Sequence, residues 1–294
     1  MNRLPVGQTI RFAYAFTFGE IGTVLGLIWI PTVLNAVGSF LVFGFVNGTA
    51  DGTMPGAQLL LTTLYIVLAF LLTAMMAVAV TQQALGLRQG PALAHFALGS
   101  AEMRVFGGFF GLYLLFLLFV LAFAIVIGVA AVAGGAVIKA SAGGGAMASL
   151  GAVVLGLCGL CALIYVFVRL SFLFIPSAVV DGAFGLTRSW ELTKGNFWRI
   201  FAVGLAVLVP LFAVQAVAEY LILGPGYFAS IVAMAQDQAH AARYSAEQAE
   251  IVRTRLPLLL GMGLILAPIM QGLLFSPAAF AYRVLSGKAL ESKA

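Results

Sequence analysis

The stretch RLSFLFIPSAVVDGAFGLTRSWELTKGNFWRIF, residues Arg169–Phe201, decides how the rest of the chain is interpreted. It gathers charge, proline, tryptophan and glycine between two long apolar runs. The chain of 294 residues is 63% hydrophobic and only 9% charged, whereas soluble domains carry about 25% charged residues. Because so few polar side chains cannot cover a globule in water, we expect the apolar runs to face lipid.

The apolar runs predict an all-α, polytopic membrane protein that forms one integral membrane domain over residues 1–294. A spanning helix needs about 20 apolar residues. Six runs meet that length, at about 21–46, 58–85, 105–133, 150–176, 196–223 and 256–282. Between the last two, residues of about 227–254 are charged and alanine-rich, which predicts a water-facing amphipathic helix on the outer side.

The distribution of positive charge predicts the orientation of the chain. Six spans place both termini on the same side of the membrane. With that side inside, eleven Lys and Arg residues fall inside and four fall outside, counted along the printed sequence. Positive charge collects on cytoplasmic loops, so we expect both termini to be cytoplasmic.

Three short segments of the chain are similar to one another and suggest an internal repeat. Short mixed segments at 5–18, 91–104 and 184–199 each precede a span on the predicted cytoplasmic side. Aligning the first segment with the third pairs Gly19 with Gly195. Either the chain repeats one unit of interfacial helix, span and span three times, or the segments are similar only because junctions between loops and membrane helices resemble one another in general.

Four residues predict the local structure of the opening stretch. Pro176 should end or kink the fourth span, because proline lacks an N–H and restricts the residue before it. Asp181 is typical of a turn. Gly195 is a natural helix stop, and Asn196 is a plausible N-cap for the fifth span. The stretch therefore predicts an interfacial helix that turns sharply into the membrane.

The same stretch contains the candidate lipid or interface residues, which are Arg169, Arg188, Trp190, Lys194, Trp198 and Arg199. Such a basic, aromatic collar could bind anionic headgroups, or it could only fix the depth of the helices. Arg169 lies inside the fourth span, where an unpaired charge is costly. We expect it to form a structural pair with Asp181 or Glu20.

The pattern R-x6-P-x4-D over Arg169, Pro176 and Asp181, followed by TRSWELTKGNFWRIF (187–201), carries a family resemblance. It resembles a group of uncharacterised six-span bacterial proteins that includes the YciC-like inner-membrane proteins and the membrane domain of glycerophosphoryl diester phosphodiesterases. The ending PAAFAYRVLSG (277–287) is similar to that group as well. The resemblance implies a six-span fold, the bacterial inner membrane and an undefined role in envelope or lipid biology. It does not carry over hydrolase activity, because the chain has no room for a soluble catalytic domain.

No catalytic constellation, metal site or cofactor site is predicted. The sequence has no H-E-x-x-H, P-loop or G-x-S-x-G motif. Cys158 and Cys161 form a C-x-x-C within an apolar run, where helix packing is a better interpretation than redox or zinc chemistry. The two histidines, His95 and His240, lie on opposite sides of the predicted membrane.

The function predicted from these observations is that of a non-enzymatic, lipid-associated or envelope-homeostasis factor in the inner membrane. Its expected partners are membrane lipids, and nucleic acid is not expected because no basic cluster can track a phosphate backbone. The alternative is a small permease or lipid transporter, which the prolines inside several spans favour. The sequence leaves the substrate and the oligomeric state open.

Overall fold

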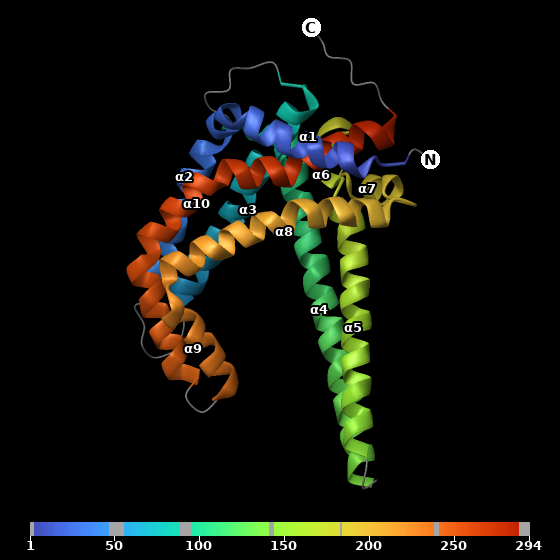
Figure 1. Ribbon diagram of the computed structural model, residues 1–294, viewed down its shortest axis with the longest axis vertical. Helices are drawn as coiled ribbons and strands as arrows, with labels where there is room; N and C mark the ends of the chain where they lie inside the picture. The colour runs from blue at the N-terminus through green and yellow to red at the C-terminus, as the bar shows by residue number, and fades with distance from the viewer. Residues whose placement is uncertain are drawn as a thin grey trace.

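The computed structural model describes residues 3–46, 56–88, 96–140, 144–182, 184–237 and 241–287, which are helical almost throughout and contain no strand. The helices, in chain order, are α1 (Val6–Gly19), α2 (Ile21–Val46), α3 (Gly56–Leu85), α4 (Ser100–Ala140), α5 (Gly144–Ser171), α6 (Phe174–Val180), α7 (Leu186–Leu192), α8 (Phe197–Leu223), α9 (Pro225–Gln236) and α10 (Ala241–Ser286) (Figure 1). This confirms the all-α fold predicted from the sequence.

Six helical segments in the described part of the chain are long and apolar enough to cross a membrane. They correspond to α2, α3, α4, α5 with α6, α8 and α10. The longest two, α4 with 41 residues and α10 with 46 residues, extend roughly 60–70 Å at 1.5 Å per residue. That is about twice the hydrocarbon thickness of a bilayer. The protein is therefore a multi-pass membrane protein, and α4 and α10 each contain more residues than one crossing of the apolar layer requires.

The spans form two legs that join at one end. Helices α4 and α5 pack side by side as one long hairpin, α9 and part of α10 belong to the second leg, and α8 runs across from one leg to the other (Figure 1). Helix α10 also packs against α2 and α3. The beginning of α1 and the end of α10 lie at the joined end, as an even number of spans requires.

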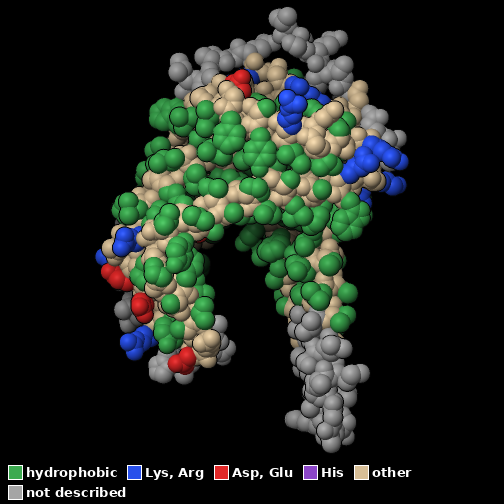
Figure 2. Space-filling view, viewed as in Figure 1, with side chains coloured by type: hydrophobic (Ala, Val, Ile, Leu, Met, Phe, Trp, Pro, Cys, Tyr) green, Lys and Arg blue, Asp and Glu red, His purple; other side chains and the backbone are tan. Residues whose placement is uncertain are grey.

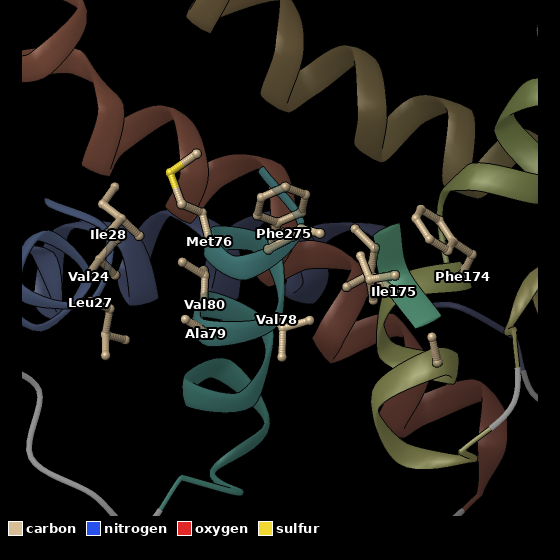
Figure 3. Close-up of a cluster of buried hydrophobic side chains, with 14 of the residues drawn as sticks. Val24, Leu27, Ile28, Met76, Val78, Ala79, Val80, Phe174, Ile175 and Phe275 are labelled. Atoms are coloured by element: carbon tan, nitrogen blue, oxygen red, sulfur yellow. The ribbon is translucent and has the colours of Figure 1, made fainter. Parts of the chain in front are cut away.

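The apolar core lies where the legs join. Val24 and Ile28 of α2, Val78 of α3, Phe174 of α6 and Phe275 of α10 belong to one buried cluster (Figure 3). Farther along the α4–α5 hairpin, most of the large apolar side chains that the structure describes are exposed. In a membrane protein such side chains face lipid, so the core has only to fix the helices where they cross.

Helix α1 lies across the joined end of the bundle and packs on α10 and α8 (Figure 1). Its buried face is made of Thr9, Ala13 and Thr17, which recur every four residues. A Cβ added to Gly272 of α10 would lie 2.8 Å from the Thr17 side chain, so glycine is needed for this close approach. The helix predicted within residues 5–18 is present.

The three segments of the predicted repeat differ in the structure. Helix α7 lies within 184–199 and corresponds to the third segment. In the second segment, residues 96–99 are not helical and α4 begins at Ser100, while 91–95 lie outside the described residues. The threefold repeat stays a hypothesis.

The predicted fourth span, about 150–176, is broken near its end. Helix α5 ends at Ser171, and the short helix α6 begins at Phe174. Pro176 causes the break from within α6, because a proline ring clashes with the carbonyl four residues earlier, here that of Phe172. The proline thus interrupts the span as predicted, but the interruption comes before it.

The prediction of one outer helix over about 227–254 was wrong. Helix α9 ends at Gln236, and a new helix, α10, begins at Ala241 and continues through the sixth span to Ser286. The physical reason is that no glycine stop occurs between 241 and 260. A proline such as Pro257 can remain inside a membrane helix without ending it.

Candidate functional site

The end of α5, helix α7 and the start of α8 meet around Arg169, whose residue surface is only 7% exposed. Its Nε donates a hydrogen bond to Thr193 Oγ1 (3.3 Å), and its Nη1 donates to the Tyr165 hydroxyl (3.0 Å). Its Nη2 donates to the backbone oxygen of Trp190. The Trp190 ring covers the guanidinium, with Cζ 3.7 Å from the ring centroid. Arg169 is thus held by neutral acceptors and an aromatic face.

The predicted ion pair of Arg169 with Asp181 or Glu20 was wrong. Asp181 accepts a hydrogen bond from the Tyr282 hydroxyl (2.8 Å), and its Oδ2 lies 3.9 Å from Arg188 Nε. Glu20 is exposed at the end of α1. Within the described residues Arg169 has no carboxylate partner, because α7 folds back against α5 and places neutral groups around the guanidinium.

The break between α5 and α6 is bridged by Ser189 of α7. The Ser189 hydroxyl donates to the Arg169 carbonyl (2.8 Å) and accepts from the Leu173 N–H (3.2 Å). Thr193, one turn later, donates to the Ser189 carbonyl (2.8 Å). Ser189 and Thr193 are fully buried. Backbone groups at a helix end need such partners, so Ser189 holds α7 against the break, and Thr193 adds the contact with Arg169 Nε.

Sequence reasoning missed Ser189 and Thr193. The available signal was a pair of hydroxyl residues four positions apart, hence on one face of α7, shortly after Pro176. A proline break leaves unpaired backbone groups, and short hydroxyl side chains are suited to satisfy them.

The turn from α7 into α8 follows the prediction at Gly195 but differs at Asn196. Gly195 has φ +78°, the left-handed conformation of a helix stop. Asn196 occupies the N-cap position, yet its side chain does not cap α8. Its Oδ1 instead accepts from the Leu4 N–H (3.1 Å), while Arg199 Nη1 donates to the Leu4 carbonyl (3.3 Å). The start of the chain is thereby held against α8.

The six predicted collar residues therefore have different roles. Arg169, Trp190 and Arg199 are engaged in contacts within the protein. Arg188 lies 3.2 Å from Glu191 Oε2 in an exposed ion pair. Lys194 is exposed, and Trp198 is 75% exposed. Figure 2 shows Lys and Arg side chains gathered at the end of the molecule where α7 lies.

A cavity of about 730 Å³ lies between α4, α5, α8 and α10. The side chains that line it are apolar or aromatic, apart from the hydroxyls of Tyr113 and Ser171. It occupies the region where the two legs diverge, and Figure 2 shows hydrophobic side chains around that hollow. Such a lining suits a hydrocarbon ligand and disfavours an ion or a polar solute.

A row of aromatic rings connects the cavity with the collar. Phe201 lines the cavity and stacks on Phe197, with ring centroids 5.9 Å apart. It also meets the exposed Trp198 edge to face at 6.1 Å. The Phe197 ring lies 4.8 Å from that of Tyr165, which binds Arg169. Cavity and collar are thus parts of one region.

The remaining chemical candidates are the two cysteines and the two histidines. Cys158 and Cys161 are unpaired and exposed on α5, so the expectation that they pack in the core was wrong. His95 and His240 lie outside the described residues. Within the described ranges, no group of three His, Cys, Asp or Glu residues could hold a metal ion.

Comparisons of the chain with family models, with curated proteins and with solved structures find no match. The resemblance of the Arg169–Phe201 stretch to the YciC-like group therefore stays a prediction.

Proposed function

We propose that the chain is a non-enzymatic integral membrane protein that binds membrane lipids, with an anionic headgroup at the junction of α7 and α8. The observation that carries this proposal is a pair of exposed residues at the start of the apolar helix α8: Lys194 lies in the turn before the helix, and Trp198 lies in its first turn. A cation and an indole ring at the start of a membrane helix are suited to the headgroup layer.

The charge around the junction supports an anionic ligand. The cations of this region are Arg169, Arg188, Lys194 and Arg199, and its acids are Asp181 and Glu191. Four positive and two negative charges leave an excess of two positive charges. Because Arg188 is paired with Glu191, Lys194 is the cation best placed to meet a lipid phosphate.

We propose the bacterial inner membrane as the location, with the joined end of the bundle in the cytoplasm. The Lys and Arg excess on the predicted inner segments supports this orientation. It would place the α7–α8 junction at the cytoplasmic leaflet, whose anionic lipids attract basic residues.

Native mass spectrometry of the protein purified in mild detergent tests lipid binding. We expect retained lipid with a preference for anionic over zwitterionic headgroups. The double variant Lys194→Gln, Trp198→Ala should lose that preference. The control Arg253→Gln, which removes an exposed cation on α10 before its apolar part, should keep it. Absence of retained lipid, or equal effects of both variants, would overturn the proposal.

A lipid transporter is the second candidate, favoured by the cavity between the spans. Its apolar lining argues against a permease for polar solutes. Reconstitution into vesicles that contain a fluorescent phospholipid separates the two functions. Exchange of lipid between leaflets above that of protein-free vesicles would favour transport, and binding without exchange would favour the first function.

A further inference from the structure

We propose that the cavity between α4, α5, α8 and α10 takes one hydrocarbon chain of a phospholipid whose phosphate lies at Lys194 and Trp198. This inference rests on the proposed function and identifies where the lipid tail is bound. It makes the cavity and the collar one site for one molecule.

The size and lining of the cavity favour a lipid chain over a partner helix. Its volume of about 730 Å³ lies within the range of about 300–1,000 Å³ for ligand pockets. A spanning helix about 10 Å wide and 30 Å long occupies roughly 2,400 Å³, which is several times the volume available. A flexible acyl chain can fill an irregular apolar space and enter from the surrounding bilayer.

The position of the cavity relative to the charges favours a chain that ends in a phosphate. Ile200 and Phe201, within the first two turns of α8, line the cavity. Trp198 and Lys194 come just before them in the chain, and the Phe201 ring contacts that of Trp198. One helical turn rises about 5.4 Å. A headgroup at Lys194 can therefore remain attached to a chain that enters beside Phe201.

Gly204 offers a direct way to narrow the cavity. It lines the cavity, and a Cβ added there would meet nothing within 4 Å. Its φ lies outside the left-handed region, so a larger residue introduces no backbone strain. Gly204→Leu should therefore fold and narrow the cavity beside α8. Gly263 of α10 also has nothing within 4 Å of an added Cβ but does not line the cavity, so Gly263→Leu is a matched control.

Photocrosslinking of the full chain in vesicles tests the inference. The probe is phosphatidylglycerol with a photoreactive diazirine in mid-chain, and peptide mass spectrometry locates the adducts. We expect adducts on the lining of α4, α5 and α8. Gly204→Leu should weaken these adducts, most strongly on α8, and Gly263→Leu should leave them unchanged. Adducts that spread over the lipid-facing surface, or that are as strong in Gly204→Leu as in the unmodified protein, would overturn the inference.

The headgroup part is tested with diacylglycerol that carries the same photoreactive chain. We expect it to label the cavity far less than phosphatidylglycerol does, and equal labelling would overturn the role given to Lys194 and Trp198. If Gly204→Leu retains anionic lipid in native mass spectra and its crosslinks are unchanged, only the proposed site of the hydrocarbon chain would be overturned. If the unmodified protein retains no lipid in native mass spectra, the proposed function itself would be overturned.

Discussion

The substitution Ser189→Ala tests whether α7 locks the break between α5 and α6. It removes the hydroxyl that bridges the Arg169 carbonyl and the Leu173 N–H. Leu173 is fully buried, so its N–H cannot find water, and an unpaired buried donor costs about 1–3 kcal/mol. At tenfold per 1.4 kcal/mol, local opening should become roughly 5- to 150-fold more frequent.

Hydrogen–deuterium exchange measures this opening in peptides that cover the break. The control is Ser177→Ala on α6, because Ser177 is also fully buried but its hydroxyl has no hydrogen-bond partner among the residues that the structure describes. Removing an unpaired hydroxyl should leave exchange unchanged or slow it. Equal exchange in Ser189→Ala and the unmodified protein, or equal acceleration in both variants, would refute the reasoning.

Three other predictions follow from single residues. Gly185→Ala should lower the free energy of unfolding by more than about 2 kcal/mol, because φ is +74° and a Cβ would overlap a backbone oxygen of α6. In the control Gly226→Ala the added Cβ meets nothing within 4 Å, so the free energy of unfolding should not change. Thermal denaturation in detergent compares the two variants. Asn196→Ala should release the Leu4 N–H and make the N-terminal segment more sensitive to limited proteolysis, and unchanged cleavage would contradict the assigned contact. Ser245→Cys, in a background without the native cysteines, should react with a membrane-impermeant thiol reagent added outside cells, and reaction only after lysis would reverse the predicted orientation.

Much of the fold could be predicted because membrane spans depend on length and apolarity alone. The first span was expected at about 21–46 and is Ile21–Val46 in the structure. The ends at Gly195 and Gly224 also follow from sequence, since both adopt positive φ where a helix stops. The exact position of the α5–α6 break and the continuous α10 were missed. Both depend on how several helices share backbone partners, which periodicity does not encode.

The candidate site could be predicted only in part. Its charged residues and tryptophans were found because charge and tryptophan are rare in this chain, whereas the hydroxyl residues Ser189 and Thr193 were not. Their partners were not found, because α7 folds back and brings Trp190 over Arg169. Asn196 was assigned a local capping role, whereas its side chain binds Leu4, which is 192 residues away in sequence. Contacts of this range depend on tertiary packing, and a local motif cannot specify them.

The break in the fourth span links the stability of the protein to the proposed lipid site. Ser171 and Phe172, at the break, line the cavity. Their neighbours Arg169 and Leu173 are held by α7 through Ser189. These contacts of Ser189 therefore fix the part of the cavity wall at Ser171 and Phe172, although Ser189 itself does not line the cavity. If the lock and the cavity are coupled in this way, Ser189→Ala should reduce lipid crosslinking at α5 even though Ser189 does not line the cavity, whereas Ser177→Ala should not.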